Sequence, residues 1–400
     1  MGDGYEQSLD YIDQVVPIST VHKIPSGTKV GSWTVPQAWS VKEAWIATPD
    51  GEKIINFDKS PHCLWQYSTS TDEVISHSEL MERLAVGQGN NIPLVVTYYK
   101  KRWGFSISEE QKKLFTDREY RVYVDVGFHN SDLNIGEITI PGSSPKEVVI
   151  DAVLSCCSLA NNISGVVAAV YVAKLLMEYS NLNYTYRILF TPETIGPIAL
   201  HHTGVVESSK VVGGFNLINL ADNANIQYKS SRYSTLVDQA IAYELERRSD
   251  DFQLKEYDVR TGTCGNEKAY NSLGIEIPLG ALRRSELCSY PEYDTSGDNM
   301  NYISQQQFYK SLDLLEGIID SIESNLLYKH EFEGEPFLTG YGLFPKIESD
   351  RDRIPYDYLM GFTDGKNTLI DLANRSGLDL EDFKEPVRLM MEKDLLSVVQ

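Results

Sequence analysis

The feature that most constrains the fold is a regular alternation of apolar strands and helices after about residue 120. We expect strands over 120–126, 135–140, 148–154, 184–190, 211–220 and 275–281, and helices over 165–179, 235–246 and 305–327. Apolar strands that alternate with helices are typical of a buried, largely parallel sheet. The sequence therefore predicts an α/β sandwich whose ligand site lies beyond the carboxyl ends of its strands.

Two regions with different patterns accompany this α/β segment. Residues 20–118 contain short alternating runs separated by turn signals, which predict a small β-rich domain inserted into the larger one. Residues 350–400 contain three short helical segments and a strand, as in a winged-helix module. We therefore expect an α/β domain built from 1–19 and 119–335, which the insert interrupts and the winged-helix module follows.

The charge balance limits the classes of partner. The chain has 36 Lys and Arg against 57 Asp and Glu, a formal net charge of −21, which disfavours binding to nucleic-acid phosphates or to an anionic membrane. Residues 378–382 of the winged-helix segment are acidic where a DNA-binding module would carry basic side chains. Five scattered Cys without a CxxC pair, and no long apolar run, predict a cytoplasmic protein without a disulfide framework. We expect a small-molecule or short peptide-like ligand and leave a homo-oligomer open.

Polar residues gather where the predicted strands end. The loop 155–165 contains Cys156 and Asn162, Glu193 follows the strand 184–190, and Asp222 follows the strand 211–220. The loop 290–299 adds Tyr293 and Asp294 before the long helix. Each cluster alone also fits an ordinary capped loop or a solvated turn. A carboxylate at the position of Glu193 could act as a general base.

Taken together and in order, these motifs resemble a family of aminopeptidase-like bacterial proteins, distant relatives of the two-zinc aminopeptidases. The matching segments are Pro25-Ser26-Gly27, Trp33-Thr34-Val35-Pro36, residues 98–105, Gly136-Glu137-Ile138, Ser158-Leu159-Ala160-Asn161, residues 192–196 and Tyr290-Pro291-Glu292-Tyr293. The resemblance covers essentially the whole chain. It implies a β-rich insert, a winged helix after the α/β domain, and a place in polysaccharide or natural-product biosynthesis.

The resemblance also implies site residues, several of which differ here from the family pattern. Glu193 keeps the general-base position and Asp222 keeps a ligand position. The family's two His ligands are replaced by Cys156 and Asp294, and its bridging Asp by Asn162. The resemblance further places Asn162, Asn266, Glu267 and Tyr293 against the substrate. Zinc prefers His nitrogen and Cys sulfur, and a neutral Asn cannot bridge two dications.

We therefore expect a degenerate metal site that holds either no metal or one zinc on Cys156, Asp222 and Asp294. The favoured hypothesis is a repurposed or impaired peptidase-like protein that binds a peptide-, amino-acid- or sugar-linked ligand in the old cleft. The alternative is a one-zinc peptidase or amidase in which Glu193 activates water. Two weaker hypotheses are thiol chemistry at Cys156 or Cys157 and a scaffold that acts through the insert and the winged helix.

Overall fold

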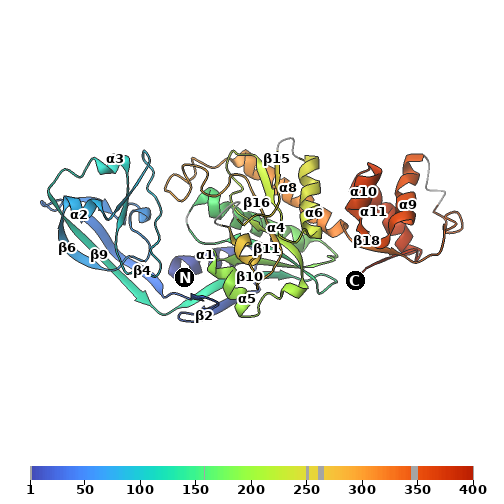
Figure 1. Ribbon diagram of the computed structural model, residues 1–400, viewed down its shortest axis with the longest axis horizontal. Helices are drawn as coiled ribbons and strands as arrows, with labels where there is room; N and C mark the ends of the chain where they lie inside the picture. The colour runs from blue at the N-terminus through green and yellow to red at the C-terminus, as the bar shows by residue number, and fades with distance from the viewer. Residues whose placement is uncertain (1, 157, 249–251, 260–264, 344–349, 400) are drawn as a thin grey trace.

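The computed structural model describes residues 2–156, 158–248, 252–259, 265–343 and 350–399. Figure 1 shows three parts in a row, with a β-rich part at one end, an α/β part in the middle and a helical part at the other end. The fold class predicted from the sequence is confirmed.

An eight-stranded mixed sheet forms the middle part, in the order β1-β10-β12-β11-β13-β16-β14-β15. The four central strands are parallel, and the flanking pairs β1–β10, β10–β12 and β14–β16 are antiparallel. The strands are β1 (Thr20–Pro25), β10 (Asp132–Ile140), β11 (Glu147–Val153), β12 (Thr185–Thr191), β13 (Val211–Leu217), β14 (Ile226–Lys229), β15 (Phe252–Lys255) and β16 (Leu279–Arg283). Expected strand 275–281 begins only at Leu279, and the sequence analysis missed β14 and β15.

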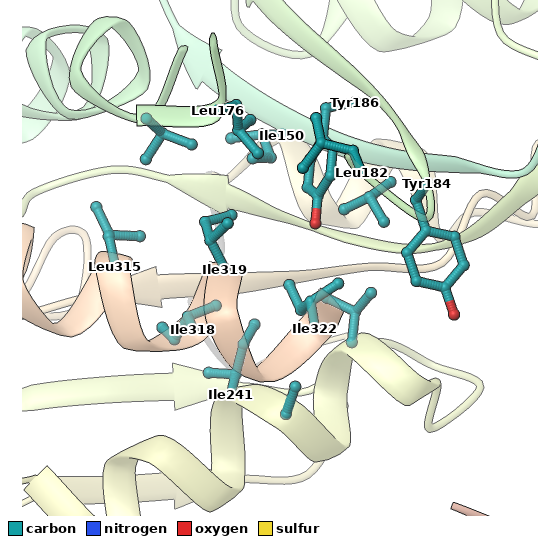
Figure 2. Close-up of a cluster of buried hydrophobic side chains, with 14 of the residues drawn as sticks. Ile150, Leu176, Leu182, Tyr184, Tyr186, Ile241, Leu315, Ile318, Ile319 and Ile322 are labelled. Carbon is teal, nitrogen blue, oxygen red and sulfur yellow. The ribbon is translucent and has the colours of Figure 1, made fainter. Parts of the chain in front are cut away.

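Helices cover both faces of this sheet. On one face lie α1 (Asp3–Val15), α4 (Ser164–Glu178), α6 (Leu236–Arg248) and α8 (Gln305–Ser324); on the other lie α5 (Ile195–His202) and α7 (Asn266–Tyr270). Figure 2 shows the core around α8, where Ile319 points toward the side of Ile150 and Leu176 and Ile318 lies beside Ile241. Only the stretch Leu159–Glu178, among the described residues, is long and apolar enough to cross a membrane, and 61% of it is buried, as in a core helix.

The insert has its own four-stranded sheet, in the order β5-β4-β9-β6. Its strands are β4 (Ala38–Ala47), β5 (Lys53–Asn56), β6 (Thr71–Ser76) and β9 (Glu119–His129), and beside it lie the pair β7 (Leu84–Gly87) and β8 (Phe105–Ser108) and the short helices α2 (His77–Met81) and α3 (Glu109–Lys112). The hairpin β2 (Lys29–Val30) and β3 (Trp33–Thr34) packs instead against α5 of the α/β part. The expected insert bounds of 20–118 place two strands in the wrong sheet. The antiparallel partner of β1 is β10 of the large sheet, whereas β9 pairs with β4 and β6. Strand propensity alone does not reveal these long-range partners.

The C-terminal part combines three helices with a three-stranded sheet. It contains β17 (Leu327–His330), α9 (Asp350–Phe362), β18 (Asp364–Thr368), α10 (Leu369–Ser376), α11 (Leu380–Glu392) and β19 (Leu396–Val398). Strand β17 lies between β18 and β19, so this sheet begins before the expected start at residue 350. The module contacts the α/β part, because the Leu380 N–H donates to the Tyr243 hydroxyl at 2.7 Å and Lys384 pairs with Asp320 of α8.

Candidate functional site

The candidate site lies at the carboxyl ends of the central strands, where the resemblance places the old peptidase cleft. The segment after β11 contains Cys156 and then a π-helical turn, Leu159–Ile163, before α4 begins. Within it, the Asn162 side-chain amide donates to the Cys156 sulfur at 3.3 Å, and the Asn161 amide donates to Asp294 Oδ1 at 3.2 Å. The structure therefore brings the loop after β11 and the Asp294 loop together, as the sequence predicts.

Glu193 follows β12 directly and is half-buried at the same edge. Burial, and then the negative charges of Asp294 and Glu267, raise its pKa to about 7. The next residue, Thr194, has a φ of 62°, a left-handed conformation that is strained for a β-branched residue. Its N–H donates to Asn266 Oδ1 at 2.7 Å, which holds the turn. Glu193 is thus a positioned carboxyl group that changes its protonation state near neutral pH.

Asp294 is the second acidic group of the cleft, and the insert fixes its loop. Burial raises its pKa, against the opposing effect of the hydrogen bond from Asn161. The Leu94 N–H donates to the Asp294 carbonyl at 2.7 Å, and the Ser296 N–H donates to the Ile92 carbonyl at 2.9 Å. The sequence analysis missed this contact, since no local pattern links residues 92–94 to residues 294–296.

The expected metal ligands do not form a metal site. Asp222 is 1% exposed, and its carboxylate accepts from the N–H of Ala224 at 2.9 Å and of Ser285 at 3.3 Å. In the described part of the chain, no group of three His, Cys, Asp or Glu side chains is arranged to hold a metal ion. Among the residues that the structure describes, Cys156, Asp222 and Asp294 are thus not arranged as a metal site, and each Asp222 carboxylate oxygen accepts from a backbone amide; the ligand set stays a prediction. The donors present do not fit zinc.

Asn266 and Glu267, expected against the substrate, are both fully buried in α7 under the cleft. Asn266 donates to Asp151 Oδ2 at 2.9 Å and to Thr191 Oγ1 at 2.7 Å. Glu267 pairs with the Lys229 ammonium at 2.7 Å. In this structure both residues support the cleft floor.

Tyr293, the other expected substrate contact, is partly buried near the floor. It packs against the small apolar cluster of Val153, Ile218 and Leu287 and meets the ring of Tyr290 edge to face. Cys157 and Cys264 lie outside the described residues, so the structure leaves the thiol hypothesis for Cys157 as a prediction.

Asp151 is a buried site residue that sequence analysis missed. It lies in the middle of β11, 0% exposed, and accepts from Thr191, Asn216, Asn266 and Tyr270 at 2.6–3.1 Å. Burial raises its pKa to about 6, although these hydrogen bonds oppose the shift. The only available signal is a single acidic residue within an otherwise apolar strand.

Tyr98 brings the insert to the cleft. Burial raises its pKa, and the nearby charges of Glu193 and Asp294 raise it further. Its ring lies 6.2 Å from that of Tyr67, which stacks on Trp39 at 6.1 Å. Tyr98 and Tyr99 also line a groove of about 810 Å³ next to Trp33. Sequence analysis quoted this segment for the resemblance but assigned it no role.

Comparison with known proteins places the chain in a family. Residues 1–325 match the model of a family described as Domain of unknown function (DUF4910), and residues 326–398 match a winged helix-turn-helix model. A Clostridium acetobutylicum protein, provisionally named a polysaccharide biosynthesis protein with an aminopeptidase-like domain, is 29% identical over 408 residues, covering 100% of this chain and 92% of its own.

Solved structures give the fold relationship. A provisionally named peptidase from Clostridium acetobutylicum has a TM-score of 0.87 at 27% identity, covering 99% of this chain and 92% of its own. A zinc aminopeptidase from Bacillus subtilis has a TM-score of 0.56 at 12% identity, covering 80% and 89%. A peptidase M28 precursor from Shewanella amazonensis has a TM-score of 0.57 at 10% identity, covering 84% and 90%. The chain belongs to the DUF4910 family, as an aminopeptidase-like α/β domain followed by a winged helix-turn-helix.

Proposed function

We propose that this chain binds an amine-bearing ligand in the cleft at the carboxyl edge of its central sheet. The ligand is an amino acid, a short peptide or a sugar-linked amine, and the protein acts in polysaccharide biosynthesis. The name of the Clostridium acetobutylicum relative supports this biological setting, and the likeness to aminopeptidases supports the location of the site.

The acidity of the cleft carries the proposal. Glu193 and Asp294 are both half-buried, and the charge of Asp294 adds to the pKa rise of Glu193. Within the described residues, no Lys or Arg forms an ion pair with either carboxyl group. A ligand ammonium placed between them would offset the repulsion and favour the ionised form of Glu193. Glu193 would also exchange a proton with the bound amine near neutral pH.

The donor set supports a repurposed cleft over a zinc hydrolase. Asp222 is held by backbone amides, and Asn162 binds the Cys156 sulfur. The two-zinc mechanism of related peptidases needs metal ions that polarise the scissile carbonyl, and the proposal does not rest on it. We therefore propose that the protein either binds its ligand without reaction or transforms it by a reaction other than two-zinc hydrolysis.

The winged helix fits a structural role in this proposal. The amino-terminal end of α11 contacts α6, where Leu380 binds Tyr243 and Asp379 pairs with Arg247. This end is therefore engaged with the α/β part, and the acidic side chains beside it disfavour nucleic acid.

Calorimetric titration with leucinol and with N-acetyl-leucinol tests the proposal. Leucinol carries an amine that stays protonated between pH 6 and 8, whereas the acetylated form is neutral. Since Glu193 ionises near pH 7, we expect leucinol affinity to rise about tenfold from pH 6 to pH 8. Glu193→Gln should abolish this rise, and Glu207→Gln, a surface control, should preserve it. Equal binding of the two probes would reject the amine site.

A further inference from the structure

A band of buried polar side chains crosses the sheet face that α5 and α7 cover. Phe215 and Leu282 belong to the large core on the opposite face, so strand alternation directs their neighbours Asn216 and Arg283 to this face. The band comprises Asp151, Thr191, Asn216, Gln227, Lys229 and Arg283, each at most 7% exposed. Such a row of buried polar groups requires internal partners.

Two of the three charged side chains in this band have partners. Asp151 accepts from Asn216 at 2.7 Å and from Thr191 at 2.6 Å. The Lys229 ammonium lies 2.7 Å from Glu267 Oε1. Arg283 is the exception, because its Nε, Nη1 and Nη2 atoms find no hydrogen-bond partner in the part of the chain that the structure describes, although the side chain is 0% exposed.

The adjacent residue, Arg284, is also buried, but its guanidinium is fully hydrogen-bonded. Its guanidinium donates to the carbonyls of Leu220, Ala224 and Gln307 and to the hydroxyl of Ser311, at 2.7–3.1 Å. All three guanidinium nitrogens of Arg284 are thus satisfied. A buried guanidinium without partners is strongly unfavourable for folding, so Arg283 is not explained by the stability of the fold.

Arg283 lies at the edge of the sheet where the cleft is built. Leu217 of β13 pairs with Leu282, so Arg283 stands one residue beyond, as the last residue of β16. On the neighbouring strand β14, Lys229 is the pairing partner of Ala281, which lies two residues before Arg283. The Lys229 ammonium forms an ion pair with Glu267, and the negative charge of Glu267 raises the pKa of Glu193. Arg283 is therefore buried at the carboxyl end of β16, on the same sheet face as Lys229 and its partner Glu267.

Among the described residues, the Arg283 guanidinium forms no ion pair, although acidic groups lie nearby. Glu267 neutralises Lys229, and Glu286 is engaged by Lys255. The charges of Arg283 and Lys229 also help to lower the pKa of Glu286, but the Arg283 guanidinium forms no ion pair with either acid. One carboxylate carries the opposite unit charge, and its two oxygens match the planar fork of a guanidinium.

We propose that Arg283 anchors a carboxylate group of the ligand in the cleft floor. The inference deepens the proposed function and rests on it for the position of the amine, so that the ligand carries an amine toward Glu193 and a carboxylate toward Arg283. Because Arg283 has no exposed surface, the carboxylate must displace side chains over the floor when it enters.

Thermal unfolding with small anions tests this assignment. The full chain is melted at pH 7.5 in sodium propionate and in sodium chloride of the same ionic strength. We expect propionate to raise the midpoint saturably by about 2–5 °C. Arg283→Met should remove this rise, and Arg283→Lys should weaken it because the bidentate fork is lost. In chloride alone, Arg283→Met should melt no lower than the native protein, whereas Arg284→Met should melt several degrees lower.

Several outcomes would overturn the proposal. These are the absence of a propionate-specific rise, its persistence in Arg283→Met, or a loss of folding in Arg283→Met like that in Arg284→Met. A larger rise with phosphate than with propionate would refute the single-charge argument. Leucinol, melted in parallel, reports the amine site separately. A response to propionate without a response to leucinol would reject the proposed amine site and retain the anchor at Arg283.

Discussion

Replacing Glu193 by Gln should stabilise the protein at neutral pH, although Glu193 is the central residue of the cleft. Its pKa is about 7 in the folded chain, against an ordinary value of 4.5, and burial is the largest cause. The folded protein therefore holds the proton more tightly than the unfolded chain does. The stability that this group contributes is complete below about pH 4.5 and is lost as the pH rises through about 7.

The expected magnitude follows from the same pKa values. Each pKa unit corresponds to about 1.4 kcal/mol, so a change from 4.5 to about 7 amounts to about 3 kcal/mol. Because Glu193 keeps some contact with solvent, we expect a gain of about 2–3 kcal/mol for Glu193→Gln at pH 8. At pH 4 the two proteins should be equally stable, since both side chains are then neutral.

Urea unfolding at several pH values, followed by far-ultraviolet circular dichroism, measures this difference. Circular dichroism reports α4, α6 and α8, whereas all five tryptophans lie between residues 33 and 103, so fluorescence would report the insert. Glu207→Gln serves as the surface control and should show no such trend. A stability difference that stays flat from pH 4 to 8, or that favours the native protein at pH 8, would refute the assignment of a buried acidic cleft.

Two further predictions concern the groups around the cleft. Burial raises the pKa of Asp151 to about 6, so the stability of Asp151→Asn relative to the native protein should increase by about 2–3 kcal/mol as the pH rises from 4 to 7. Urea unfolding that gives the same stability difference between the two proteins at pH 4 and pH 7 would contradict this. Tyr243→Phe removes the acceptor of the Leu380 N–H, so hydrogen exchange of the backbone amides in α11 should become several-fold faster. Exchange in α4 should stay the same and serves as the control. An unchanged exchange rate in α11 would refute the docking contact.

Apolar periodicity was enough to predict the central strands and the helices around them. The strands β11, β12 and β13 are mostly apolar segments, and their observed bounds lie close to the expected ones. Strand β14 was missed because Gln227 and Lys229 make it polar, although both side chains are buried. Their burial depends on the neighbouring strand and on α7, which no local pattern reveals.

The candidate site was predictable only where a residue follows a strand. Glu193 was found in this way, and the structure places it at the expected edge. The family resemblance implied a metal-ligand role for Asp222, and no local pattern reveals its partner Ser285, which lies 63 residues further along the chain. Asp151 and Arg283 escaped notice because their meaning depends on which partners they have or lack in the folded protein.

The most direct test of the central claim is the number of zinc ions per chain. Protein purified without chelator, and again after incubation with zinc and dialysis, is measured by elemental analysis beside Cys156→Ser. The donor arrangement at Cys156, Asp222 and Asp294 predicts well below one zinc per chain, with no difference between the two proteins. One or two tightly bound zinc ions, lost in Cys156→Ser together with a peptidase activity, would contradict the account.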